Sequence, residues 1–434
     1  MTLATSLNRN SKKVLVVAAL FVALLLAAIL IPASAAQNSS SDRIDFSDGQ
    51  SSLERNTYQK DGFVEFGNST NSTPTAPPTQ ATSATSPPSN PSIPSGKFYV
   101  VGKTIIDPDG YVFVPNGANI AVRQAPNLEN GFAFNWRGTA NGRSEDVKTW
   151  GWNTIRLNVI CVLPSDGPTQ AQTLKGIDEV VKEYTAKKLV VVIDCHHSEV
   201  TGKSPSFSSA IVQQTMTFYD SVTKSYKDNP YVWFNPLNEP FGTKDAAGWT
   251  ALQNGVYSRI RQNAPGNIFI ADLPDWGNDI AALVDGNLSN YSNGKCNVVY
   301  GWRGYGFING FATDASIKQY LGNASAKNIP IIVGEFGDPL TLNEGTAGPP
   351  IQNRIGAYAV MKYGPENGYG LLWWHATGDS SNFLTYSLTK DRSAPWVKGT
   401  SNLSDGGKAF WEVTHRNTPR TKFTGNLSQS GCAL

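Results

Sequence analysis

The stretch Asn235-Pro236-Leu237-Asn238-Glu239-Pro240 follows the apolar run 231–234 and carries a glutamate just beyond it. About a hundred residues later, Ile331-Ile332-Val333-Gly334-Glu335-Phe336-Gly337 repeats this arrangement at the end of the apolar run 329–333. A carboxylate at the end of a buried strand is costly to desolvate, so it is rarely there without a function. The two stretches therefore predict chemistry that uses a pair of carboxyl groups.

Short apolar runs alternate with stretches of helical character on both sides of these motifs. One such stretch, 172–187, has apolar residues at helical spacing from Leu174 to Tyr184. Eight βα units over about 300 residues predict a (β/α)₈ barrel, in which the active site lies at the C-terminal ends of the strands. The predicted strands are 117–120, 153–159, 189–194, 231–237, 267–271, 297–301, 329–334 and 370–374.

The residues around the barrel divide into further segments. The apolar runs 98–101 and 111–114 flank the turn sequence Asp107-Pro108-Asp109-Gly110 and predict a short β-hairpin. We expect residues 97–420 to form the catalytic barrel and residues 421–434 to form a C-terminal tail.

The first 35 residues are typical of an export signal. A basic start is followed by the apolar run 14–31 and by Ala33-Ser34-Ala35, which matches a cleavage site. The run is near the length that spans a bilayer, so a membrane anchor at 14–31 is an alternative. Residues 36–96, rich in Ser, Thr and Pro, predict a disordered stalk. Both alternatives predict a barrel outside the cytoplasm, either secreted or anchored.

Composition narrows the class of ligand. The formal net charge is +2, charged residues make up 16% of the chain, and no long basic block lies beyond the N-terminus, so no nucleic-acid partner is expected. The 11 tryptophans suit a neutral ligand such as a polysaccharide, whose rings stack on aromatic planes. We expect a monomer.

The sequence does not indicate how the four cysteines pair. They are Cys161, Cys195, Cys296 and Cys432.

The block from Lys97 to His415 resembles glycoside hydrolase family 5, the cellulase family of clan A, through its Asn-Glu-Pro motif and its second strand-end glutamate. The resemblance implies that Glu239 is the general acid/base and Glu335 the nucleophile. Glycosidic cleavage needs the same pair, because the departing oxygen requires a proton and the oxocarbenium-like centre requires an anion. Burial and the charge of Glu335 should keep Glu239 protonated at rest.

The resemblance also implies roles for other residues. Arg156 would hold the nucleophile as a carboxylate, although a structural ion pair is an alternative. Asn238 would bind the sugar 2-OH and Tyr305 would donate to the nucleophile. His196 would contact substrate, whereas His197 is equally compatible with a structural role.

Two tryptophans are predicted sugar platforms. Trp276 follows the fifth strand, and Trp374 ends the eighth. Because neighbouring strand residues point to opposite sides, Trp373 and Trp374 cannot both line the cleft, and we assign Trp374 to it.

The sixth strand departs from the family pattern. It reads Tyr300-Gly301-Trp302-Arg303-Gly304-Tyr305, with Arg303 where the family commonly has histidine. A fixed cation near Glu239 would lower its pKa. Either Arg303 points elsewhere, or the pH optimum is acidic, or the alignment is shifted in this loop.

The expected function is that of a secreted retaining endo-β-1,4-glucanase without a cofactor. Alternatives in the same family are a mannanase, a xyloglucanase, or a β-1,3-glucan-active hydrolase or transglycosylase; another is a non-catalytic wall protein that binds carbohydrate. A metal-dependent hydrolase would need ligands such as Asp194, His196, His197 and Glu199. The chain has only four histidines and no second histidine-rich strand end, so no metal site is expected.

Overall fold

The computed structural model describes residues 96–125, 138–165, 167–196, 200–305, 313–338, 349–377, 388–390, 400–416 and 419–432. The predicted export signal, the stalk up to residue 95, and His197 lie outside these ranges. Within them, no helix has both the length and the hydropathy needed to cross a membrane.

Eight parallel strands form a closed barrel, as predicted, and each overlaps one of the eight predicted runs. Their order around the barrel is β10-β11-β4-β5-β6-β7-β8-β9, so consecutive strands in the chain are neighbours. The strands are β4 (Asn116–Ala121), β5 (Thr154–Val159), β6 (Val190–Cys195), β7 (Val232–Asn235), β8 (Phe269–Asp272), β9 (Val298–Arg303), β10 (Ile331–Glu335) and β11 (Gly370–Trp373).

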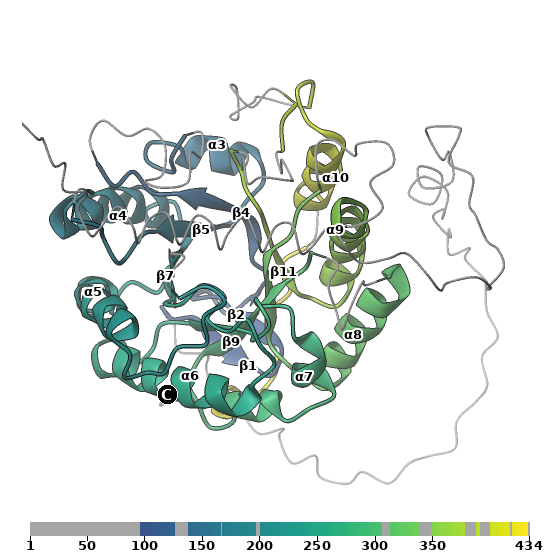
Figure 1. Ribbon diagram of the computed structural model, residues 1–434. Coiled ribbons are helices and arrows are strands. Elements are labelled where there is room, and N and C mark those ends of the chain that lie inside the picture. The colour runs from purple at the N-terminus through teal and green to yellow at the C-terminus, as the bar shows by residue number, and fades with distance from the viewer. Residues whose placement is uncertain are drawn as a thin grey trace, which may run out of the picture. The chain divides into compact units, whose positions relative to one another are not determined.

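Helices surround the strands (Figure 1). The predicted helix 172–187 is α4, and it begins earlier because Thr169 and Gln172 form a capping box, each side chain accepting from the other's backbone N–H. The helices are α3 (Ser144–Thr149), α4 (Gln170–Thr185), α5 (Ala210–Tyr226), α6 (Ala246–Asn263), α7 (Ile280–Val284), α8 (Asp314–Ala326), α9 (Pro349–Glu366) and α10 (Asp405–Thr414), with 3₁₀ turns η1 (Leu288–Ser292) and η2 (Leu427–Ser430).

The barrel interior has an apolar half and a polar half. Along β6, Val192 belongs to the interior cluster, and Asp194 is the next residue on the same side because side chains alternate along a strand. Along β8, Ile270 and Asp272 follow the same pattern. The polar half therefore lies at the C-terminal strand ends. The apolar half consists of Phe98, Val100, Ile105, Val190, Val192, Trp233, Ile268, Ile270, Val299, Ile332 and Leu372.

A small antiparallel sheet closes the apolar end. It contains β1 (Tyr99–Val101), β2 (Thr104–Ile106) and β3 (Val112–Phe113) in that order. The turn at 107–110 is where we predicted it, but the predicted hairpin omitted β2, which lies between the two runs and pairs with both. Positive φ at Gly102 allows the tight turn between β1 and β2 that the apolar pattern does not reveal.

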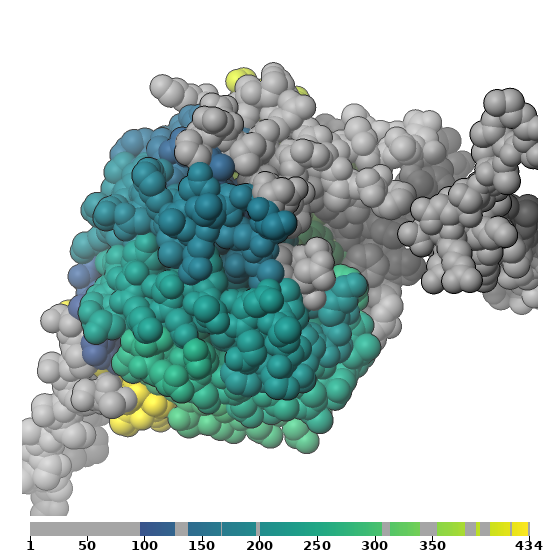
Figure 2. All heavy atoms as spheres, turned by 60° about the vertical axis from the view of Figure 1, so that its left-hand side comes forward, coloured from purple at the N-terminus to yellow at the C-terminus, as the bar shows by residue number. Residues whose placement is uncertain are grey.

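The predicted C-terminal tail packs against this sheet. Leu427 of η2 joins a buried cluster with Tyr99, Val101 and Ile106. Lys422 forms an antiparallel bridge with Tyr111. Figure 2 shows the yellow C-terminal atoms beside the purple N-terminal strands.

All four cysteines are paired. Cys161, just after β5, is bonded to Cys195 at the end of β6, and Cys296, before β9, is bonded to Cys432. The first disulfide joins neighbouring strand ends, and the second attaches the C-terminal segment to the barrel.

Two helix glycines should respond in opposite ways to alanine. In α4, a Cβ at Gly176 would lie 1.9 Å from the backbone oxygen of Arg123, whereas one at Gly322 in α8 would meet no heavy atom within 4 Å. Gly176→Ala should lower the free energy of unfolding by about 1–3 kcal/mol through overpacking. Gly322→Ala should raise it by about 0.5–1 kcal/mol through helix propensity. Urea denaturation of both variants measures the difference. Equal stabilisation would contradict the close packing of α4.

Candidate active site

Strand register brings polar side chains to one level of the barrel. Arg156 on β5 is paired with Asn119 on β4, Asp194 on β6 with Asn235 on β7, and Glu335 on β10 with Arg303 on β9. Inward-facing residues of a barrel stack in layers. The C-terminal ends of the strands therefore form one polar layer.

Arg156 is the centre of this layer and is 1% exposed. Its Nη1 donates to Glu335 Oε1 at 2.6 Å, and its Nη2 donates to Asp194 Oδ1 at 2.7 Å. The remaining hydrogen bonds go to the side-chain oxygens of Asn119, Asn235 and Asn238. These contacts use all five guanidinium N–H groups, so the orientation of Arg156 is fully specified.

A register shift in β10 points Glu335 into the barrel. Val333 pairs with Trp302, but Glu335 pairs with Arg303, so the ladder is irregular between them. Ile332 faces the interior, and strict alternation would turn Glu335 outward. The irregularity reverses this direction, as β-bulges commonly do near active sites. Tyr305 Oη then donates to Glu335 Oε2 at 3.1 Å.

Glu239 lies just beyond β7 on a strained backbone. Its φ of +45° is in the left-handed region, which is costly for a residue other than glycine. Contacts on both sides of the residue hold it there. Its N–H donates to Asp272 Oδ2 at 3.2 Å, and its carbonyl accepts from the N–H of Gly202 at 2.7 Å. Its side chain remains 15% exposed, so the carboxyl is accessible.

The two glutamates converge on one arginine. Arg303 Nε lies 3.0 Å from Glu239 Oε1 and 3.4 Å from Glu335 Oε1. The two oxygens can therefore be at most about 6.4 Å apart, the sum of these distances. Inverting glycosidases separate their carboxyl groups by about 6.5–9.5 Å and retaining enzymes by about 5–5.5 Å. The upper bound for this pair of oxygens is compatible with the retaining arrangement.

The environment separates the proton affinities of the acidic groups. Burial and then the negative charge of Glu335 raise the pKa of Glu239 to about 7, although Arg303 and His196 oppose the rise. Burial also acts to raise the pKa of Asp194, but the charges of Arg156 and His196 outweigh it and leave that pKa lowered. Glu239 is therefore the carboxyl suited to hold a proton near neutral pH.

Arg303 does not point away from the site. Besides Glu239, it donates to Asn238 Oδ1 at 2.6 Å and to Asp272 Oδ2. Tyr305, two residues on, reaches Glu335, so the alignment is not shifted there. An acidic optimum is not favoured either, because burial and Glu335 outweigh the cation in setting the pKa of Glu239.

Sequence reasoning missed several polar residues of this layer. Asp272 was missed because the predicted fifth strand ended at 271, although its alternation with Ile268 and Ile270 could have indicated it. Asn119 and Asn235 were given no role, although Asn235 begins the stretch that carries Glu239. Both are buried and hydrogen-bonded to Arg156.

His196 and Trp374 form one wall of the site. Their rings stack with centroids 4.8 Å apart and an interplanar angle of 18°. His196 Nδ1 lies 2.9 Å from Asp194 Oδ2. Trp373 is instead fully buried against Phe336 and Phe410, so Trp374 is the tryptophan of this pair that lies beside the polar layer.

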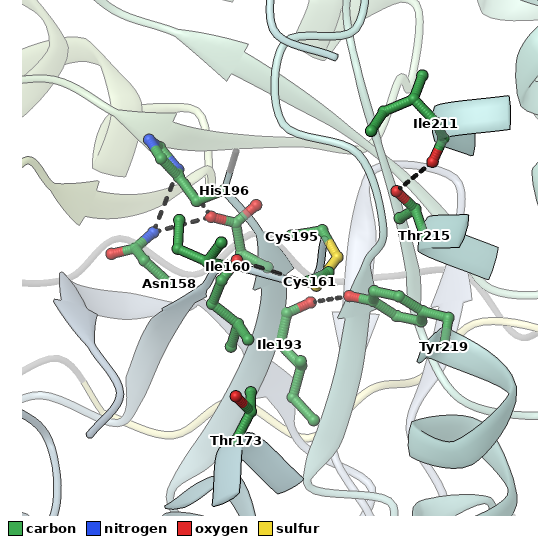
Figure 3. Close-up of a disulfide and its surroundings, with 12 residues drawn as sticks. Asn158, Ile160, Cys161, Thr173, Ile193, Cys195, His196, Ile211, Thr215 and Tyr219 are labelled. Atoms are coloured by element: carbon green, nitrogen blue, oxygen red, sulfur yellow. Dashed lines mark hydrogen bonds and ion pairs between the residues drawn. A yellow bond between two sulfur atoms is a disulfide. The ribbon is translucent and has the colours of Figure 1, made fainter. Parts of the chain in front are cut away.

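A disulfide supports the strand end that carries His196. Cys195 directly precedes it and is bonded to Cys161 (Figure 3). On the α5 side, Tyr219 Oη donates to the carbonyl of Ile193. The end of β6 is therefore held by a covalent bond and by a helix contact.

Trp276 is 47% exposed and is the one large exposed apolar side chain of the described ranges. A Cβ at Gly202 would lie 2.3 Å from its indole, so the ring packs directly over this glycine. Since the Gly202 N–H donates to the Glu239 carbonyl, Trp276 lies close to the site.

Across the part of the chain that the structure describes, no group of three or more His, Cys, Asp and Glu side chains could hold a metal ion.

Known proteins are similar to this chain in sequence. The model of the cellulase family, glycosyl hydrolase family 5, matches residues 116–380. A mannan endo-1,4-beta-mannosidase of Streptomyces lividans is 25% identical over 289 residues, covering 66% of this chain and 67% of its own length. A second mannan endo-1,4-beta-mannosidase, from Cellvibrio japonicus, is 24% identical over 352 residues, covering 78% and 72%. Endoglucanase A of Butyrivibrio fibrisolvens is 26% identical over 254 residues, covering 56% and 52%.

Solved structures share the fold. The catalytic domain of a mannanase from Streptomyces sp. SirexAA-E matches with a TM-score of 0.54 and 20% identity, over 77% of this chain and 95% of that one. A mannotriose complex of Thermomonospora fusca β-mannanase matches with a TM-score of 0.55 and 18% identity, over 74% and 95%. With the barrel and the family match together, the chain belongs to glycosyl hydrolase family 5 and is a β-glycanase.

Proposed function

We propose that the chain is a retaining endo-β-1,4-mannanase. The approach of the Glu239 and Glu335 carboxyl oxygens to the same Arg303 Nε supports a double displacement. The names of the relatives support mannan as the substrate in preference to the β-1,4-glucan expected from the sequence.

In the first step Glu335 attacks the anomeric carbon and the bond to the leaving oxygen breaks. Glu239 donates its proton to that oxygen, and a glycosyl ester of Glu335 forms. Before attack, Arg156 and Tyr305 each hold one oxygen of Glu335, which orients the carboxylate.

In the second step Glu239 takes a proton from water as the water oxygen attacks the anomeric carbon. The ester bond breaks and Glu335 leaves as a carboxylate, so the sugar regains its original configuration. Esterification removes the negative charge that had helped to raise the pKa of Glu239. Its pKa therefore falls when it must act as a base.

Asn238 is positioned to bind the sugar 2-OH. Its Oδ1 accepts from Arg156 at 2.8 Å and from Arg303 at 2.6 Å, so the orientation of the amide is fixed. Its Nδ2 donates one N–H to Thr201 Oγ1 at 3.3 Å, and the second N–H is the donor that we assign to substrate. Mannose and glucose differ in the orientation of this hydroxyl, so this contact bears on substrate choice. We assign Trp374, His196 and Trp276 to the walls of the cleft.

An endoglucanase is the second candidate, since Butyrivibrio fibrisolvens Endoglucanase A is also a relative.

We further propose that the protein acts outside the cytoplasm, which the pairing of all four cysteines supports.

Purified protein should release reducing ends from β-1,4-mannan at least about tenfold faster than from cellulose derivatives, xyloglucan or β-1,3-glucan. A reducing-sugar assay on this panel measures the preference. Faster release from a β-1,4-glucan would favour the endoglucanase candidate.

Glu335→Ala should lower turnover at least about a thousandfold, because no ester can form. Azide should restore cleavage of an activated aryl β-mannoside and give the α-mannosyl azide, since it attacks from the side that Glu335 vacates. For wild-type enzyme, proton NMR of the reaction should show the β-anomer of the new reducing end first, because the double displacement retains the configuration. Glu412→Gln, at an exposed site on α10, is the matched control. Near-normal turnover in Glu335→Ala would contradict the assignment.

The pH profile of kcat/KM should have an alkaline limb near pH 7. Glu239 must be protonated to act as an acid, and its pKa is raised to about 7, so the rate falls as pH increases through that value. Initial rates from pH 4 to 9 test this. A flat profile to pH 9 would exclude Glu239 as the titrating acid.

A further inference from the structure

Arg303 and Asp272 form a buried ion pair beside the two glutamates. Both side chains are fully buried, on adjacent strands β9 and β8. Arg303 Nη2 donates to Asp272 Oδ2 and to Asn238 Oδ1. Its Nε donates to Glu239 Oε1 at 3.0 Å. The guanidinium therefore links its anchor Asp272 to the acid/base proposed above.

Three glycines provide the space for this pair. A Cβ at Gly301 would lie 2.1 Å from Asp272 Oδ1. A Cβ at Gly334 would lie 2.5 Å from Arg303 Nη1, and one at Gly277 would lie 2.5 Å from Arg303 Cγ. Positions on β9, on β10 and in the loop after β8 thus all accommodate the pair, which is built into the barrel end.

We propose that Arg303, anchored by Asp272, is a positioning residue that fixes the Glu239 carboxyl and favours its ionised form in the second step. The inference rests on the proposed retaining mechanism, within which it assigns a role to a residue that departs from the family pattern. Histidine is neutral above its ordinary pKa, whereas a guanidinium remains charged. The cation is therefore permanent in this chain.

The effect of Arg303 differs between the two steps. In the free enzyme, burial and Glu335 outweigh it, and Glu239 holds its proton. In the ester, Glu335 is neutral, whereas Arg303, which lies 3.0 Å from Glu239 in the free enzyme, keeps its charge, so the balance moves toward the carboxylate. Burial opposes the charge of Arg303, but Asp272, Glu335 and Glu239 outweigh it and raise the pKa of Arg303 well above its usual value.

The charged groups around Glu239 come from several strands. Glu335 on β10 and Asp272 on β8 favour its protonated form, whereas Arg303 on β9 and His196 after β6 favour its ionised form. Behind them lie Arg156 on β5 and Asp194 on β6, which pair with each other. Removing Arg303 or Asp272 should therefore shift the proton affinity of Glu239 in opposite directions.

The test is the pH dependence of kcat/KM on soluble β-1,4-mannan. Arg303→Met should raise the alkaline limb by about 1–3 pH units, because a cation within about 4–6 Å lowers a carboxyl pKa by that amount. Asp272→Asn should move the alkaline limb to lower pH, by a smaller amount than Arg303→Met moves it to higher pH. Arg303→Lys should keep the limb close to wild type yet lower kcat, since one ammonium cannot replace the planar set of contacts.

A second readout is the burst on an activated aryl β-mannoside. With the base step slowed, Arg303→Met should accumulate the ester and show a burst of one phenolate per enzyme before slow turnover. Arg259→Met is the matched control, because Arg259 pairs with Asp220 on the outer helices at 2.6 Å. It should leave the limb and the burst unchanged.

Loss of activity in the Arg303 and Asp272 variants without shifted limbs would overturn the proposal, since a purely structural role predicts that result. If Arg303→Met does not fold, Arg303→Met/Asp272→Asn removes both buried charges and avoids an unpaired anion. The alkaline limb of the double variant should lie at a pH between that of wild type and the higher pH expected for Arg303→Met. An alkaline limb at the wild-type pH would also overturn the proposal. Wild-type enzyme inactive on every β-glycan would instead contradict the proposed function.

Discussion

The need to neutralise buried charge at one end of the barrel determines how this site is built. Arg156 and Arg303 lie among Asp194, Asp272 and Glu335, and all five side chains are at most 5% exposed. An unpaired charge at such a depth costs several kcal/mol, so no member of the set can be removed without consequence for the others. Two cations face three anions, and ionising Glu239 would add a fourth. Burial and then the negative charge of Glu335 raise the pKa of Glu239.

Both proposed catalytic carboxyls stand where the backbone departs from regular geometry. Glu335 follows a register shift in β10, and Glu239 has a positive φ. Neither conformation is favoured by the local sequence, so the surrounding contacts must maintain it. Asp272 and Gly202 hold the Glu239 backbone, while Arg156 holds the Glu335 side chain. The ion network therefore fixes geometry as well as charge.

The barrel could be predicted because short, largely apolar runs alternate with helical stretches, and this alternation is a local property of the sequence. The strand β2 is only three residues long, and its turn depends on Gly102, so the apolar pattern did not separate it from its neighbours. The two glutamates and Arg156 were found through motifs at strand ends. Asp272 was not found because the predicted strand ended one residue before it. The pairing of Cys161 with Cys195 was left open because it depends on which strand ends are adjacent in space. Substrate choice was hardest, since loops outside the barrel shape the cleft.

The outcome for Arg303 shows why a residue type alone does not predict its effect. A cation beside an acid suggests a lowered pKa, but its strength depends on what else is buried with it. Here burial and then the charge of Glu335 outweigh the cation in setting the pKa of Glu239, and Asp272 adds to their effect. Arg303 stays charged in the working pH range, because its anionic neighbours raise its pKa well above the usual value. In the proposed mechanism the charge that changes near Glu239 is that of Glu335, which disappears when the ester forms and returns when it is hydrolysed. The proton affinity of the acid/base is thereby coupled to progress of the reaction itself.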